Sequence, residues 1–103
     1  MDNTIIRDVF VAFVRVHLLH HAAKEPIFGL EMIEELRRHG YALSPGTLYP
    51  ILHGLEGAGL VRSRAKVVNG KMRKYYSATA KGRSALTEAR EKIRELVGEV
   101  LEE

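Results

Sequence analysis

The stretch that most constrains the fold runs from Leu43 to Leu60 and begins with a helix-start signal. Ser44 is a favourable N-cap, and Pro45 suits the first helical position, where its missing N–H is not needed. Four apolar side chains then recur at helical spacing and predict one buried face: Leu48, Ile51, Leu52 and Leu55. The opposite face is uncharged and of mixed character: Thr47, Tyr49, Pro50 and His53. Such a face indicates contact with a partner molecule.

Two helices are predicted before this stretch. Residues from about 2 to 23 are apolar around much of a helical circumference, so this helix should be buried partly by its own domain and partly by another subunit. Pro26 ends it, because the residue before a proline avoids helical geometry. A second helix is expected over about residues 29–39, with Leu30, Ile33 and either Leu36 or Met32 facing inward. Gly40 stops it in the left-handed conformation, and the short link to Ser44 is typical of a helix-turn-helix.

After the glycines at 57 and 59, the apolar period changes from that of a helix to that of a strand. Residues 60–68 and 71–78 read as two strands joined by Asn69-Gly70, a strong signal for a two-residue type I′ hairpin. In that register Val68 faces Lys71, Lys66 faces Arg73, and Arg64 faces Tyr75. Alternation turns one of the two adjacent tyrosines, Tyr75 and Tyr76, inward.

The hairpin lies in an interval without acidic residues, between Glu56 and Glu88. This interval holds eight cations: Arg62, Arg64, Lys66, Lys71, Arg73, Lys74, Lys81 and Arg83. Directly opposed like charges destabilise a two-stranded ribbon, so a solubilising role explains the pattern less well than contact with a polyanion. The whole chain has a formal net charge of only +3, which makes the local concentration of charge the informative feature.

From Thr79, a candidate N-cap, the sequence is helical again to its end. Two interlocking heptad positions form a narrow apolar seam: Leu86, Ala89, Ile93, Leu96 and Val100. We expect this seam to pair with a second copy, so that residues 1–78 form the folded domain and residues 79–103 a dimerisation helix. The alternative is a helix that folds back on its own domain.

Composition excludes several classes of protein. The 103 residues contain no Cys, so disulfides, thiolate metal sites and Cys nucleophiles are absent. No apolar run is long enough to span a membrane, and no signal-peptide pattern is present, so a cytoplasmic location is expected. No catalytic constellation and no cofactor motif can be placed, and we expect no enzyme activity. His17 and His21, one helical turn apart beside His20, could begin a zinc site, but no third ligand is evident and no metal is expected.

Three helices, a basic hairpin and a final helix give the order α-α-α-β-β-α of a mainly α, winged helix-turn-helix protein. We expect the third helix to enter the major groove of double-stranded DNA and the hairpin to contact the backbone or the minor groove. The candidate DNA-binding residues are Ser44, Thr47, Tyr49, Pro50, His53, Arg64, Lys66, Lys71, Arg73 and Lys74. Tyr49 is expected to be exposed and to reach a phosphate. The alternative function is a protein-interaction module whose basic hairpin binds an acidic protein partner.

The run Gly40-Tyr41-Ala42-Leu43-Ser44-Pro45-Gly46-Thr47-Leu48-Tyr49-Pro50-Ile51-Leu52 and the later Arg73-Lys74-Tyr75-Tyr76 resemble the PadR family of bacterial and archaeal transcriptional regulators. The resemblance extends from about residue 18 to residue 86. It implies a homodimer held by the C-terminal helix with help from the N-terminal one, as in the branch with a single short C-terminal helix. It also implies repression from a palindromic operator, relieved by a small-molecule effector.

The chain departs from the family pattern in three places. It has Leu30 where the family commonly has Tyr, a compact turn at residues 67–70, and no aromatic residue after Tyr76. A planar drug sandwiched by an aromatic residue of the C-terminal helix is therefore not expected. A cavity lined by Phe10, Phe13 and Val97 is the candidate effector site.

Overall fold

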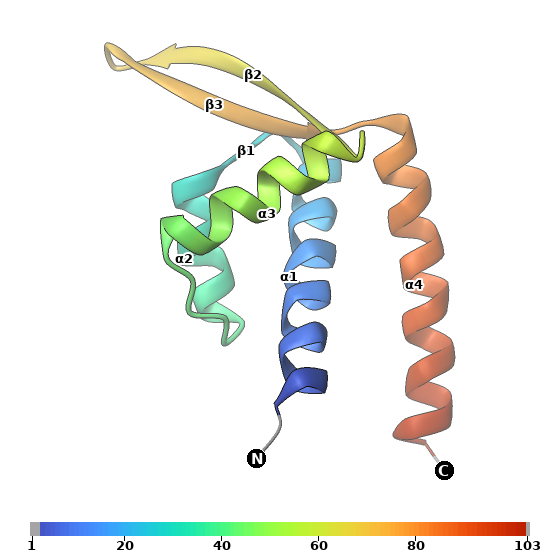
Figure 1. Cartoon of the computed structure of the whole chain (residues 1–103). Coiled ribbons are helices and arrows are strands. Elements are labelled where there is room, and N and C mark those ends of the chain that lie inside the picture. The colour runs from blue at the N-terminus through green and yellow to red at the C-terminus, as the bar shows by residue number, and fades with distance from the viewer. Residues whose placement is uncertain (1–2, 103) are drawn as a thin grey trace.

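The computed structural model describes residues 3–102, and its elements follow the predicted order with one addition (Figure 1). The elements are α1 (Thr4–Lys24), β1 (Ile27–Phe28), α2 (Gly29–Arg38), α3 (Pro45–Gly57), β2 (Val61–Val68), β3 (Lys71–Ala78) and α4 (Ala80–Val100). The winged helix-turn-helix fold is therefore confirmed. The predicted start of the first helix at residue 2 lies outside the described residues.

The addition is β1, which the sequence did not predict. It pairs antiparallel with β3, Ile27 opposite Tyr76 and Phe28 opposite Tyr75, so the sheet has three strands in the order β1-β3-β2. Two residues are too few to show an alternating pattern. Pro26 favours an extended chain at this point, but only the nearby edge of β3 turns that extension into a strand.

The core lies between four parts of the chain: the C-terminal half of α1, the helices α2 and α3, and the end of the hairpin that is away from its turn. Its fully buried side chains include Val14, Leu18, Leu36, Leu48, Leu52 and Tyr76. The buried stripe predicted for α3 is confirmed for Leu48, Leu52 and Leu55, while Ile51 is half-buried beside them. The inward position of Leu30 is wrong, because its side chain is 51% exposed whereas Met32, Ile33 and Leu36 are buried. Since α2 begins directly after β1, the strand sets the rotation of the helix, and this placement could not be predicted from periodicity.

The hairpin has the predicted register. Val68 pairs with Lys71, Lys66 with Arg73 and Arg64 with Tyr75. Asn69 and Gly70 both have positive φ, 52° and 76°, as a type I′ turn requires. The turn thus fixes which side chains share a face of the ribbon.

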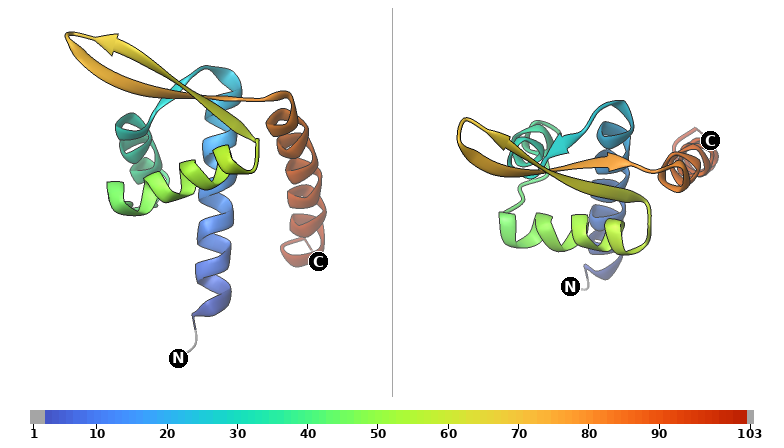
Figure 2. Two further views of the ribbon diagram at one scale, coloured as in Figure 1. Left: turned by 45° about the horizontal axis from the view of Figure 1, so that its top comes forward. Right: turned by 90° about the horizontal axis from the view of Figure 1, so that it is seen from above.

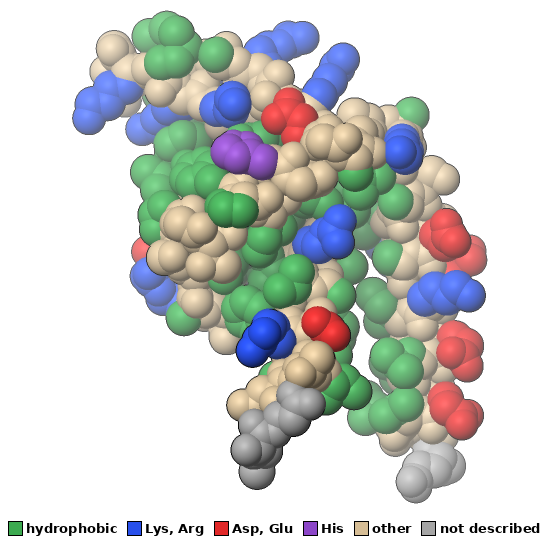
Figure 3. Space-filling model, in the orientation of Figure 1, with side chains coloured by type: hydrophobic (Ala, Val, Ile, Leu, Met, Phe, Trp, Pro, Cys, Tyr) green, Lys and Arg blue, Asp and Glu red, His purple; other side chains and the backbone are tan. Residues whose placement is uncertain are grey.

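The N-terminal half of α1 and most of α4 extend away from this core (Figures 1 and 2). The radius of gyration is 14.8 Å, whereas a compact domain of this length has about 13 Å. Hydrophobic side chains line the sides of α1 and α4 that face each other across a hollow (Figure 3). The exposed large hydrophobic residues of these two helices include Ile5, Ile6, Val9, Phe13, Ile93, Leu96 and Val100.

The first residue of the predicted dimerisation seam, Leu86, is assigned wrongly. Leu86 is only 3% exposed and belongs to the core of its own protomer, so it is not available to a second copy. The first turns of α4 are held against the body of the domain, and the helix separates from it further on. The rest of the seam is accessible: Ala89 is half-buried, and Ile93, Leu96 and Val100 are 37%, 50% and 59% exposed.

Candidate nucleic-acid interface

The start of α3 presents hydroxyl groups to solvent. Ser44 occupies the predicted N-cap position, and its carbonyl accepts the backbone N–H groups of Thr47 and Leu48, both at 3.0 Å. Its side chain does not cap a backbone N–H of the described residues; Ser44 Oγ lies 3.4 Å from Thr47 Oγ1 instead. Both residues are exposed. Hydroxyls beside unsatisfied helix N–H groups are suited to a phosphate oxygen.

The outer face of α3 is open where the sequence predicted it, except at one residue. Thr47, Pro50 and His53 are exposed, and α3 continues through Pro50. The expectation that Tyr49 is exposed is wrong. Its ring is half-buried against the core and covers Gly29, and it lies 6.3 Å from the His53 ring. The bulk of Tyr49 therefore joins α3 to α2.

The C-terminal end of α3 is fixed to the hairpin by a carboxylate that sequence reasoning missed. Glu56 Oε2 accepts the backbone N–H of Ser63 at 2.9 Å and the Ser63 hydroxyl at 2.7 Å. These hydrogen bonds, with the charges of Lys74 and His53 nearby, hold the pKa of Glu56 below its usual value. No local pattern reveals this pair, because it depends on how β2 turns back over α3.

A second joint holds the start of α4 to the loop after α3. Thr79 Oγ1 donates to the carbonyl of Gly59 at 2.6 Å and accepts the N–H of Gly82 at 3.0 Å, which confirms Thr79 as an N-cap. Lys81 Nζ donates to the carbonyl of Ala58 at 2.8 Å. The helix that presents the open face and the helix that extends from the domain are therefore directly connected.

The hairpin cations are divided between the two faces of the ribbon. One face carries Arg62, Arg64, Lys66, Lys71 and Arg73, as follows from the predicted register, and this face points away from α3. Lys74 lies on the other face, which packs on α3 through the buried Val61 and Tyr76. Arg73 is half-buried, with its guanidinium carbon 4.7 Å from the centre of the Phe28 ring, a cation–π contact that holds it in place.

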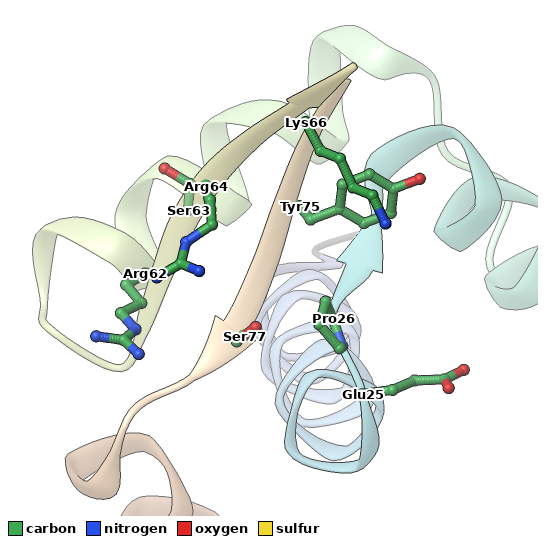
Figure 4. Close-up of a pocket in the computed structure, with 8 residues that line it drawn as sticks. All are labelled: Glu25, Pro26, Arg62, Ser63, Arg64, Lys66, Tyr75 and Ser77. Atoms are coloured by element: carbon green, nitrogen blue, oxygen red, sulfur yellow. The ribbon is translucent and has the colours of Figure 1, made fainter. Parts of the chain in front are cut away.

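The face away from α3 is hollowed into an open groove of about 590 Å³ (Figure 4). Arg62, Arg64 and Lys66 from β2 line one side, Tyr75 and Ser77 from β3 lie beside them, and Glu25 and Pro26 close the far end. Three exposed cations along one strand make this groove electropositive. It is a surface on which an anion is attracted without being enclosed.

A smaller, mostly apolar groove of about 290 Å³ lies between α1 and α4. Its lining is Phe13, Val16, His17, His20, Leu86, Arg90 and Ile93. Of the three residues predicted for an effector cavity, only Phe13 lines it. Phe10 is half-buried and packs edge-on against Tyr41, with 5.3 Å between the ring centres, and Val97 lies further along α4.

The histidines of α1 contact one another and their neighbours. His17 stacks on His39 with 4.9 Å between ring centres, His39 Nε2 lies 3.0 Å from Glu35 Oε2, and Arg90 donates to Nδ1 of His20 at 3.2 Å. Burial, the largest cause in each case, lowers the pKa of His17, His20 and His21. Within residues 3–102 no group of three or more His, Asp or Glu side chains is arranged to hold a metal ion.

None of the described helices is long and apolar enough to cross a membrane.

A helix-turn-helix with an open recognition face, joined to a basic β-hairpin, defines a winged helix-turn-helix DNA-binding protein. Comparison with known proteins narrows this class. Residues 18–88 match the Transcriptional regulator PadR-like family. The chain is 52% identical over 96 residues to the transcriptional regulator Rv3488 of Mycobacterium tuberculosis, which covers 93% of this chain and 90% of the relative.

Solved structures agree with this assignment. A PadR family transcriptional regulator from Eggerthella lenta superimposes with a TM-score of 0.80 at 29% identity, covering 97% of this chain and 91% of the other. A PadR-like transcriptional regulator from Bacillus cereus gives a TM-score of 0.76 at 27% identity, with 89% and 94% covered. The chain belongs to the PadR-like family of transcriptional regulators, which is a family of regulators and not of enzymes.

Proposed function

We propose that this regulator is a repressor that binds a palindromic operator as a homodimer. Each protomer places the exposed face of α3 in the major groove, where Thr47, Pro50 and His53 contact base edges, and Ser44 contacts a phosphate. The hairpin cations Arg64, Lys66, Lys71 and Lys74 attract the backbone, while Arg73 steadies the hairpin through Phe28. The observation that carries this proposal is the open, uncharged face of α3, which is fixed beside a basic hairpin by the Glu56–Ser63 hydrogen bonds.

The homodimer is inferred from the exposed apolar side chains on the extended parts of α1 and α4. Ile93, Leu96 and Val100 continue the predicted seam, and Ile5, Ile6 and Val9 are exposed on α1. Several large apolar side chains exposed on two helices of one short monomer indicate an interaction site. A second copy would cover them and would place two α3 helices about one DNA turn apart.

The groove between α1 and α4 is the candidate effector site. An apolar floor from Phe13, Leu86 and Ile93, with Arg90 at its edge, suits a small molecule that has an apolar body. Because α4 begins at the hydrogen-bonded joint with Ala58 and Gly59, a ligand that shifts α4 would also shift the end of α3. We infer that the effector releases DNA through this connection.

The proposal is tested with the duplex that the wild-type protein selects from a pool of random sequences. The logarithm of the binding constant should fall linearly with the logarithm of the salt concentration, since lysine and arginine contacts displace counterions from the DNA. Thr47→Ala and His53→Ala should reduce affinity for the selected duplex by roughly 5- to 150-fold and relax its sequence preference. Lys71→Gln and Lys74→Gln should each weaken binding to all sequences and lower the salt slope by about 1.

A salt-independent affinity would contradict the proposed interface. Unchanged DNA affinity after charge reversal at Lys71 and Lys74, with loss of binding to an acidic protein, would favour the alternative protein-interaction function. Repression is measured separately, with a reporter gene placed behind the selected duplex.

A further inference from the structure

The end of the hairpin carries two exposed apolar side chains that face each other across the strands. Val67 pairs with Met72, and their side chains are 61% and 70% exposed. These are large exposures for side chains held in regular β-structure, and the type I′ turn at Asn69-Gly70 fixes both on one face. Nothing within the described part of this protomer covers them.

The face that carries this pair is the face that packs on α3. Along β2 and β3 it runs from Val61 and Tyr76, which are buried over α3, to the exposed pair at the end of the hairpin. The strong charges at positions 62, 64 and 66 lie on the reverse face. The apolar pair therefore lies on the same side of the ribbon as the helix that is proposed to read DNA.

Cations surround the pair. Lys74 shares its face, while Lys66 and Lys71 flank it from the reverse face, and all three are exposed. Figure 3 shows hydrophobic side chains at the end of the hairpin with Lys and Arg side chains around them. No acidic residue occurs anywhere in the two strands or the turn.

An apolar centre ringed by cations matches the minor groove of a DNA duplex. The walls of that groove are sugar rings, which are apolar, and a row of phosphates runs along each edge. Met and other apolar side chains are among the residues that proteins insert into the minor groove. The unbranched, flexible Met side chain can adapt to an irregular surface.

We propose that Val67 and Met72 form an apolar minor-groove contact at the outer end of each half-site, next to the major groove that α3 enters. This inference rests on the proposed function, because it needs the DNA to be on the α3 side. The pair packs against the sugar walls, while Lys66, Lys71 and Lys74 contact the flanking phosphates. The contact adds affinity that does not depend on counterion release.

The test compares two double variants on the duplex that the wild-type protein selects. V67T/M72Q keeps the size of both side chains and suits a strand, but it makes the pair polar. We expect affinity to fall on the order of tenfold, since two apolar side chains lose their contact, with the salt slope unchanged. The control K66Q/K71Q should lower the salt slope by about 2 instead. Hydroxyl-radical footprinting should show that V67T/M72Q loses minor-groove protection beside the major-groove site.

Thermal unfolding of both variants should match the wild type, because the four side chains are not in the core. If V67T/M72Q is unstable, the single variant M72Q takes its place in the affinity and footprinting measurements. Unchanged affinity and footprint in V67T/M72Q, with normal wild-type binding, would overturn this inference and leave the proposed function standing. If V67T/M72Q instead lost binding to vesicles containing phosphatidylglycerol and kept its DNA affinity, the minor-groove contact would be wrong and a membrane contact would be favoured. Failure of the wild-type protein to bind any duplex would instead contradict the proposed function.

Discussion

Gly29 lies directly beneath the phenol ring of Tyr49. A Cβ atom at Gly29 would be 2.6 Å from Tyr49 Oη and 2.8 Å from two ring carbons, so the ring occupies the space that any larger residue would need. This pair joins the first residue of α2 to the middle of α3 and sets how closely the two helices approach. A glycine is required here by packing, since its backbone does not have positive φ.

Gly29→Ala should therefore destabilise the protein by about 1–3 kcal/mol through overpacking. Tyr49→Ala removes the obstruction, so Gly29→Ala should cost much less in that background. Thermal unfolding of the two single variants and the double variant gives the coupling energy. Gly54→Ala, in α3 with open space around the added atom, is the matched control and should be neutral or slightly stabilising. Equal costs of Gly29→Ala in both backgrounds would contradict the packing relationship.

Gly82 is the residue on which the joint between the start of α4 and the loop after α3 depends most. A Cβ atom there would lie 1.9 Å from the carbonyl oxygen of Leu60, which is backbone and cannot rotate away. Gly82→Ala should cost at least about 3 kcal/mol and displace α4 from the domain. Gly98→Ala in the same helix has nothing within 4 Å and should stabilise the protein by up to about 1 kcal/mol. Chemical denaturation of the two variants makes the comparison, and similar stabilities would show that the joint can shift freely.

The accessible part of the seam on α4 should hold the homodimer. L96E/V100E places charges on two side chains that are 50% and 59% exposed in the protomer, so folding should survive while dimerisation fails. Light scattering after gel filtration should show the mass of one chain, against two for the wild type. E95Q/E99Q, at exposed neighbouring positions, is the control and should remain dimeric. A dimeric L96E/V100E variant would place the interface elsewhere.

Acid should weaken the contact between α1 and α4. Arg90 donates to Nδ1 of His20, which requires an unprotonated nitrogen, and burial together with the charges of Lys24, His21 and Arg90 lowers the pKa of His20. In the unfolded chain the pKa of His20 has its ordinary value of 6.5, whereas folding lowers it. The contribution of neutral His20 to stability is therefore fully present above pH 6.5 and is lost as the pH falls through the lower pKa of the folded state.

The pKa values of His17 and His21 are also lowered, which adds to the loss of stability in acid. The pKa values of Glu35 and Glu56 are lowered too, but carboxylates affect stability only in a more acidic range. The melting temperature should therefore fall between about pH 7.5 and pH 5.5. In H17Q/H20Q/H21Q the fall should be smaller over the same range. An unchanged pH profile in that variant would show that these side chains do not control it.

Features that depend on neighbours along the chain could be predicted from the amino-acid sequence. The type I′ turn at Asn69-Gly70 needs only two residues that tolerate positive φ, and it fixes the whole hairpin register and the shared face of Lys66 and Arg73. The buried stripe of α3 follows from helical spacing, and Thr79 caps α4 through a bond to Gly82, three residues away. The runs at residues 40–52 and 73–76 together carry the resemblance to the PadR family, which the match over residues 18–88 confirms.

Features that depend on residues far apart in the chain could not be predicted in this way, because they are set by how the elements pack. A two-residue strand forms at Ile27 and Phe28 only because β3 offers its edge, and that strand turns Leu30 outward. Leu86 belongs to the core and not to the seam, since the first turns of α4 are tied to the loop after α3. Tyr49 is half-buried because Gly29 leaves room for its ring, and Glu56 bonds Ser63 because β2 returns over α3. Periodicity describes one element at a time, whereas each of these outcomes is set by the energy of packing one element on another.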